Sequence, residues 1–258
     1  MVKKTGIIIQ ARMASTRLPG KIFLNLKEKP ILWHVIKRCE KSRANKIIIA
    51  TSLNKENNPI EEFCKKNKIS CFRGSEKNVL KRYYLCAKEY GLEIIVRITS
   101  DCPLIDPKLI NLCLKNFEKT KYNYYSNVVE RSFPRGLDVE VFDFQTLEKT
   151  YQKVKNTSQK EHVTIFIYNN PKKFKIGSLI AKGIFNNPTL RLCVDTPKDF
   201  KLLNIIYNKF YKKRLVSIEE VLKFLINNPK IAQINLESEK QHLNKNAKEK
   251  IKQKFIKN

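Results

Sequence analysis

The chain has 258 residues, of which 42% are hydrophobic and 10% aromatic, a composition typical of a soluble globular protein with one sizeable core. It contains no apolar run long enough to cross a membrane and no secretory start followed by a cleavage site, so we expect a cytoplasmic protein without membrane insertion. Its seven cysteines are scattered and form no C-x-x-C pair, which indicates neither a disulfide framework nor a zinc site.

The formal net charge is +28, from 52 Lys and Arg against 24 Asp and Glu. Such a charge is compatible with nucleic acid binding, but the lysines are spread along the whole chain and form no basic tract beside stacking aromatics. A basic surface would equally attract a nucleoside triphosphate or an anionic sugar by long-range steering. We therefore expect no nucleic acid partner and keep a nucleic-acid-binding protein only as a remote alternative.

The first half of the chain alternates apolar runs with amphipathic segments. The pattern predicts strands over 6–10, 46–50, 70–72 and 94–99, and helices over 30–40, 58–67, 77–89 and 107–117. Continuous apolar strands between helices are typical of sheets that are covered on both faces. The sequence therefore predicts an α/β fold with a mostly parallel, Rossmann-like sheet and helices on both of its faces.

The second half is less regular and predicts an inserted, smaller α+β segment over about 122–180. Within it we expect strands over 136–142 and 173–180 and helices over 145–154 and 159–168. The chain then returns to the core with a strand over 190–194, and T-P-K-D predicts a capped helix from 197 to about 208. Because the composition becomes Lys, Glu, Gln and Asn rich after 232, we predict one domain over 1–232 and a charged C-terminal tail over 233–258, either a surface helix or disordered.

The most informative stretch is IIIQARMASTRLPGK, at 7–21, where a buried strand opens directly into a polar loop. Arg12 and Arg17 offer forked donors and Lys21 offers a point charge, a set that suits a polyphosphate. Further donors in the loop are the hydroxyls of Ser15 and Thr16 and the backbone N–H groups around Gly20. The loop has neither the GxGxxG of dinucleotide-binding folds nor the GxxxxGK[ST] of P-loop proteins, so both are excluded.

Two aspartates follow predicted strands at the edge of the sheet where ligands bind. Asp101 lies just after strand 94–99, and Asp195 lies just after strand 190–194. Two carboxylates at such positions can converge on one hard cation, with waters and phosphate oxygens as its other ligands. The pair predicts a Mg²⁺ site, although each aspartate taken alone could serve as a turn or helix cap.

The basic loop, together with RITSDCPLID and LRLCVDTPKDF, resembles the cytidylyltransferases that make CMP-activated sugar acids, a group that includes the spore-coat polysaccharide proteins. The resemblance spans most of the chain. It implies the fold of nucleotide-diphospho-sugar transferases and a Mg²⁺-dependent transfer of CMP from CTP to an acidic sugar, with release of pyrophosphate, for surface polysaccharide or glycoconjugate biosynthesis. It also implies that Asp101 and Asp195 bind the metal and that a homodimer forms through the middle segment.

The same resemblance implies roles for individual residues. The residues expected to act in catalysis are Arg12, Arg17, Lys21 and Asp101. The residues expected to bind the nucleotide are Gln10, Ala11, Arg12, Ser15, Thr16, Lys21, Ser52, Arg73, Gly74, Ser75 and Arg82. The chain departs from its relatives at Asn58, Asn78 and Lys81, where they often carry acidic residues, and this affects the finer substrate assignment.

Five residues are candidates for the sugar site. Arg97 lies inside a strand and is expected either to reach a carboxylate ligand or to pair with an internal acid. Asp138 and Glu140 alternate with apolar residues, so their face of the strand lines the sugar pocket or, as we favour, is solvated. Glu161 and His162 resemble a family Glu-His pair, and His162 is expected to orient or activate a sugar hydroxyl unless it is only structural.

Two other enzyme functions stay open. One is a nucleotidyltransferase for a sugar 1-phosphate, and the other is a glycosyltransferase that uses a finished nucleotide-sugar. The absence of a D-x-D motif disfavours the glycosyltransferase. The product separates the alternatives, because nucleotidyl transfer releases pyrophosphate, whereas sugar transfer releases a nucleotide.

Overall fold

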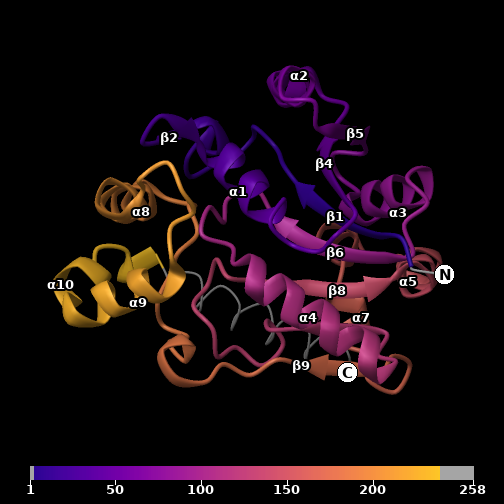
Figure 1. Ribbon diagram of the computed structural model, residues 1–258. Helices are drawn as coiled ribbons and strands as arrows, with labels where there is room; N and C mark the ends of the chain where they lie inside the picture. Colours follow the sequence, from indigo (N-terminus) through magenta and orange to yellow (C-terminus); the bar gives the residue numbers. More distant parts are fainter. Residues whose placement is uncertain (1–2, 239–258) are drawn as a thin grey trace.

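A central sheet of seven strands organises the molecule, and the computed structural model describes residues 3–238 (Figure 1). Its strands are β1 (Thr5–Gln10), β4 (Lys46–Ser52), β5 (Ser70–Gly74), β6 (Ile94–Thr99), β7 (Tyr124–Ser126), β8 (Glu140–Asp143) and β9 (Ile176–Ser178), in the order β5-β4-β1-β6-β8-β7-β9. Pairing is parallel from β5 to β6 and between β7 and β9, and antiparallel on both sides of β8. A short hairpin of β2 (Asn25–Leu26) and β3 (Lys29–Pro30) lies apart. The predicted mostly parallel sheet is confirmed.

Helices cover both faces of the sheet, as predicted. They are α1 (Ile31–Cys39), α2 (Asn58–Lys66), α3 (Val79–Glu89), α4 (Pro107–Thr120), α5 (Phe144–Lys153), α6 (Thr157–Glu161), α7 (Ile165–Tyr168), α8 (Pro197–Phe210), α9 (Ile218–Asn227) and α10 (Pro229–Ala232). Alternate residues of β1 enter opposite cores: Ile7 and Ile9 pack with α1, α4, α8 and α9, and Ile8 packs with α3 and α5. Among the described residues, no helix is long and apolar enough to span a membrane.

Three predicted elements differ from the structure. Residues 190–194 form no strand: their backbone makes one isolated parallel bridge, between Arg191 and Arg135, and continues as a loop. The predicted helix 159–168 is interrupted between α6 and α7, where Val163 adopts a φ of 54°. The predicted strand 136–142 begins only at Glu140, because Leu137 and Val139 bond to the side chain and backbone of Asn127 instead of pairing with a neighbouring strand.

The C-terminal part contributes more to the core than the composition suggests. Helix α9, which was not predicted, is capped by Ser217 and buries Ile218, Val221, Leu222 and Leu225. Asn235, placed by the sequence in the charged tail, is 1% exposed. Residues 239–258 of that tail lie outside the described residues.

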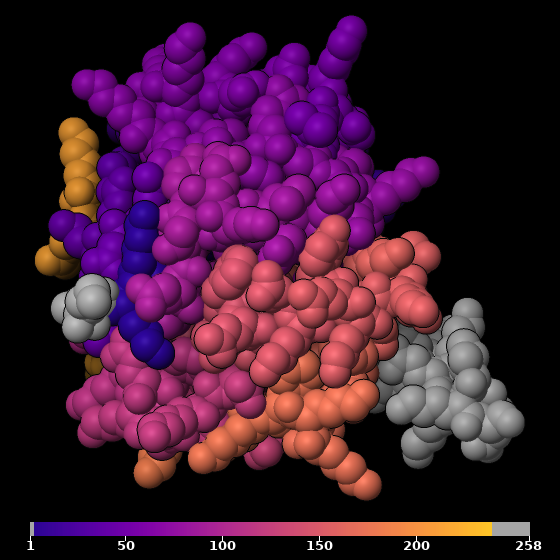
Figure 2. All heavy atoms as spheres, turned by 90° about the vertical axis from the view of Figure 1, so that its right-hand side faces the viewer, coloured from indigo at the N-terminus to yellow at the C-terminus, as the bar shows by residue number. Residues whose placement is uncertain are grey.

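Apart from the antiparallel β8, the strands of the sheet point their carboxyl ends toward the side of the molecule where α8, α9 and α10 lie together, at the left of Figure 1. Figure 2 shows the opposite side, at the amino ends of the strands, where the purple residues of the N-terminal half lie directly against the salmon residues of the middle segment. The loops that follow β1 and β6 therefore share one edge of the sheet, which is the edge where ligands bind in open parallel sheets.

Candidate active site

A cavity of about 640 Å³ opens at the carboxyl ends of β1 and β6. The loop that follows β1 forms one wall of it. Of the residues predicted to form a site, the cavity is lined by Gln10, Ala11, Arg12, Ser15, Thr16, Arg17, Lys21, Arg82, Arg97, Asp101, Glu161, His162 and Asp195. Tertiary structure thus brings together residues that lie between 10 and 195 in the chain.

The basic loop is closed by its own backbone. Gly20 has a φ of 66° and donates from its N–H to the carbonyl oxygen of Met13 at 3.1 Å. The side chain of Asn57, at the end of the 3₁₀ helix η2 (Lys55–Asn57), accepts from the Met13 N–H at 2.8 Å. This closure sets Lys21 at the first position of the 3₁₀ helix η1 (Lys21–Phe23), with its side chain directed into the cavity.

Lys21 forms ion pairs with both predicted metal ligands. Its Nζ lies 2.5 Å from Oδ2 of Asp101 and 2.6 Å from Oδ1 of Asp195. The backbone keeps the aspartates together without a strand at 190–194, because the Val194 N–H donates to the carbonyl oxygen of Asp101 at 2.8 Å. The expectation that Asp101 and Asp195 converge therefore agrees with the geometry, although the predicted strand before Asp195 is absent.

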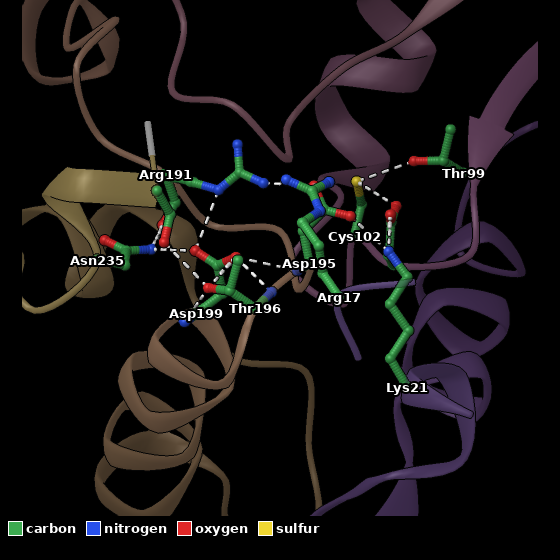
Figure 3. Close-up of polar contacts among 11 residues, drawn as sticks. Arg17, Lys21, Thr99, Cys102, Arg191, Asp195, Thr196, Asp199 and Asn235 are labelled. Carbon is green, nitrogen blue, oxygen red and sulfur yellow. Dashed lines mark hydrogen bonds and ion pairs between the residues drawn. The ribbon is translucent and has the colours of Figure 1, made fainter. Parts of the chain in front are cut away.

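A buried polar network supports Asp195 from behind (Figure 3). Arg191, whose side chain is 0% exposed, donates to Oδ2 of Asp195 and, at 3.0 Å, to Oδ1 of Asp199. Asp199 accepts from the backbone N–H groups of Asp195 and Thr196, and Asn235 donates to it at 2.8 Å. Sequence reasoning assigned no site role to Asn235, or to Arg191, although Arg191 lies only four residues before Asp195.

The electrostatics of the cluster hold the Asp195 carboxylate and the Lys21 ammonium in their charged forms. Burial alone would raise the pKa of Asp195, but Lys21, Arg191 and Arg17 together hold that pKa well below its ordinary range. Burial alone would lower the pKa of Lys21, whereas the two neighbouring carboxylates raise it well above its ordinary value. Burial, assisted by Asp101, also raises the pKa of the Cys102 thiol well above its ordinary value, so Cys102 is no thiolate nucleophile.

Arg97 pairs with the internal acid Glu140, one of the two outcomes expected for it. It also donates to Oε1 of Gln10 at 2.9 Å, and Glu140 accepts from Tyr124 at 2.8 Å and from Thr164 at 2.5 Å. The favoured solvated strand face is wrong, because Glu140 is 5% exposed and is buried by this network.

Several predicted binding residues do not line the cavity in the described structure. Arg73 bonds to the Ser52 carbonyl oxygen and pairs with Glu61, and the hydroxyl of Ser52 bonds to Asn57. Asp138 is held by both terminal nitrogens of Arg131, at 2.9 and 3.1 Å. The roles assigned to these residues, and to Gly74 and Ser75, stay predictions.

The cavity also has lining residues that the sequence analysis did not single out: Met13, Ala14, Pro19, Glu56, Val79, Thr99 and Ser100.

Arg82 is a buried cation at the cavity wall. It is 3% exposed, donates from Nη1 to the Ser75 carbonyl oxygen at 2.8 Å, and its buried Nε meets no acceptor among the described residues. Burial lowers the pKa of its guanidinium, and Arg12 lowers it slightly further. The cavity therefore combines a buried arginine, three cations of the basic loop and two convergent carboxylates.

Comparison with known proteins gives a consistent result. A family described as "Cytidylyltransferase" matches residues 6–244. The chain is 32% identical to the spore coat polysaccharide biosynthesis protein SpsF of Bacillus subtilis over 237 residues, covering 87% of this chain and 95% of that protein. It is 32% identical to the 3-deoxy-manno-octulosonate cytidylyltransferase of Marinobacter nauticus over 130 residues, 48% of each chain. A solved cytidylyltransferase structure from Leptospira borgpetersenii matches with a TM-score of 0.85 at 34% identity, over 90% of this chain and 98% of that one.

Proposed function

The chain belongs to the cytidylyltransferase family of CTP-dependent nucleotidyltransferases, and we propose that it transfers CMP from CTP to an acidic sugar for surface polysaccharide or glycoconjugate biosynthesis. The names of two relatives support this choice, one for polysaccharide biosynthesis and one for a sugar acid. The observation that carries the proposal is the cluster of Lys21, Asp101 and Asp195 beneath a loop with two further arginines.

The basic loop would bind the triphosphate. Arg12 and Arg17 are exposed at the cavity, and Lys21 lies below them, so three positive charges face the space where β and γ phosphates would lie. Charge that develops on departing pyrophosphate is stabilised by such fixed cations. The spare Nε donor of Arg82 adds a fourth cation at the same wall for the nucleotide.

The residues fit a magnesium ion. Asp101 and Asp195 approach one point within 2.5 and 2.6 Å, so a single cation near that point would reach both carboxylates. Among the described residues no group of three or more His, Cys, Asp or Glu could hold a metal, which agrees with an ion that uses one or two carboxylates and completes its shell with waters and phosphate oxygens. Bound there, Mg²⁺ would polarise the α-phosphate as a Lewis acid.

The acceptor sugar would enter opposite the loop. Glu161 and His162, at the end of α6, are exposed and line the cavity. In the proposed reaction a sugar hydroxyl attacks the α-phosphorus of CTP, the bond to the β-phosphate breaks, and pyrophosphate leaves. His162 would orient that hydroxyl or accept its proton.

A homodimer through residues 122–180 and a cytoplasmic location are further parts of the proposal. Light scattering during size-exclusion chromatography tests the dimer.

Pyrophosphate release in the presence of Mg²⁺ tests the proposal. CTP, UTP, ATP and GTP are each combined with a panel of sugar acids and sugar 1-phosphates. We expect release only with CTP and a sugar acid. Release only with a sugar 1-phosphate would contradict the acidic acceptor, and release of a nucleotide from a nucleotide-sugar would contradict nucleotidyl transfer.

A further inference from the structure

The ammonium of Lys21 lies at the point where the two carboxylates would hold their cation. Its Nζ contacts Asp101 at 2.5 Å and Asp195 at 2.6 Å, and only 11% of its side chain is exposed. Magnesium–oxygen bonds measure about 2.0–2.1 Å. A magnesium ion bound to both carboxylates would therefore need the space that the Lys21 ammonium occupies. Lys21 and the cation therefore exclude each other from this point.

Among the residues that the structure describes, the charges of the cluster balance without a metal. Asp101, Asp195 and Asp199 supply three negative charges, and Lys21, Arg17 and Arg191 supply three positive charges within ion-pair distance. A divalent cation that entered while Lys21 stayed would meet a neutral cluster and a neighbouring ammonium. Removal of the ammonium would instead leave a net negative site.

Of these three cations, Lys21 is the one that lies between both carboxylates, so its departure would vacate the point where they converge. Arg191 is fully buried and tied to Asp199, and Arg17 reaches Asp195 alone, at 3.2 Å. Lysine has a flexible four-carbon stem, and the cavity above it is lined by Arg12, Arg17 and the rest of the basic loop. Phosphate oxygens bound in this cavity would give the ammonium alternative partners.

We propose that Lys21 acts as an internal competitor of the divalent cation, so that the Asp101–Asp195 pair binds metal tightly only after nucleotide phosphates have drawn the ammonium away. This inference rests on the proposed function. It makes cation and nucleotide binding interdependent: each raises the affinity for the other by the same factor. The enzyme would then take up its metal together with CTP and not before it.

Binding of Mn²⁺ to the whole protein, followed by the electron paramagnetic resonance signal of free Mn²⁺, tests the inference without turnover. Wild type and Lys21→Met are titrated with Mn²⁺ alone and with CTP in the absence of any sugar. We expect Lys21→Met to bind Mn²⁺ alone at least about tenfold more tightly than wild type, and CTP to raise the affinity of wild type far more than that of the variant.

Three variants control this experiment. Arg12→Met removes the same charge from the same cavity but no ion pair with either aspartate, so it should leave the affinity for Mn²⁺ alone near the wild-type value. Lys21→Gln repeats the comparison should the methionine variant fold poorly. Asp101→Asn combined with Lys21→Met should lose the tight site.

Equal Mn²⁺ affinity of wild type and Lys21→Met without CTP, with CTP-dependent binding in both, would overturn the inference and leave the proposed function intact. Failure of every variant to bind Mn²⁺ with CTP would overturn the inference together with the proposed metal site. Tight Mn²⁺ binding by Lys21→Met in a protein that fails the pyrophosphate assay would support the inference and contradict the proposed reaction.

Discussion

Asp101 combines two properties that a metal ligand needs. It lies at the end of a central strand, and its carboxylate is directed at the same point as that of Asp195. The neighbouring backbone supports it, since its carbonyl oxygen accepts from Val194. Both the strand and the backbone contact therefore fix the position of this carboxylate.

Asp101→Asn should lower the rate of pyrophosphate release by about 10²-fold or more, because a fixed charge at the reacting phosphate is lost while the side-chain shape is kept. Rate measurements at saturating CTP and thermal melts should show lost turnover in a folded protein. Asp106→Asn is the matched control: Asp106 caps α4 outside the cavity, and asparagine caps helices about as well. Wild-type turnover in Asp101→Asn would contradict the role of this carboxylate.

Glu140→Gln should lower the free energy of unfolding by about 3–5 kcal/mol, because Arg97 would lose the carboxylate that pairs with it in the interior. Urea denaturation measures the change. Glu118→Gln removes the same charge from an exposed pair with Arg43 and should cost at most about 1 kcal/mol. Equal losses in the two variants would show that the buried pair contributes no more than a surface pair.

At the scale of elements, the loop at 190–195 is held by backbone contacts with the segment before β8. Arg135 donates to the Leu190 carbonyl oxygen at 3.0 Å, and Leu192 donates to the Arg135 carbonyl oxygen at 2.7 Å. Gly136 permits this approach, because it has a φ of 99° and an added Cβ would lie 2.6 Å from the Leu192 carbonyl carbon. The position of Asp195 thus depends on a glycine in another segment.

Gly136→Ala should destabilise the protein by about 1–2 kcal/mol from its positive φ and by about 1–3 kcal/mol more from overpacking. Gly183→Ala is the matched control, since Gly183 has a φ of 56° but no atom within 4 Å of an added Cβ. Urea denaturation of both variants isolates the steric part of the effect. If the two variants were equally stable, the contact with Leu192 would be tolerant of a methyl group.

At the scale of the whole molecule, the protein loses stability at both ends of the pH range because its buried ion pairs lose a charge there. Asp138 and Asp195 have pKa values below their ordinary value of 3.8, despite burial that alone would raise them, because Arg131 and the Lys21 cluster pair with them. Because each aspartate has a lower pKa in the folded than in the unfolded protein, its ion pair stabilises the fold above pH 3.8. This contribution is lost as the pH falls toward the pKa of the aspartate in the folded protein. Lys21, with its raised pKa, stabilises the fold below pH 10.5 and loses this contribution as the pH rises further.

The contribution of Asp138, Asp195 and Lys21 to the free energy of unfolding should therefore be nearly constant between about pH 4 and pH 10.5. Below about pH 4 the free energy of unfolding should fall. Urea denaturation at a series of pH values measures this profile. Asp138→Asn removes one of the groups responsible and should make the acid decline shallower than in wild type. An unchanged decline in this variant would exclude Asp138 as a contributor.

Much of the fold follows from local patterns. The isoleucine runs of β1, β4 and β6 are apolar on both sides, which predicts strands buried between two layers of helices, and the helices α1, α3, α4 and α8 begin within a few residues of their predicted starts. The apolar spacing and serine cap of α9 were a usable signal that was missed. Residues 190–194 were misassigned because an apolar run predicts burial, and here backbone bonds to two distant segments replace strand pairing.

Residue types and their spacing predicted the basic loop and the two aspartates, since a strand end followed by clustered charges is a local feature, and the resemblance of three segments predicted the family. The bridge from Lys21 to both carboxylates, the support of Asp195 by Arg191 and Asn235, and the burial of Glu140 by Arg97 appear only in the folded molecule. The physical reason is that ion pairs and hydrogen bonds act over a few ångströms. Residues far apart in the chain can meet at such distances only through the packing of the sheet and its helices.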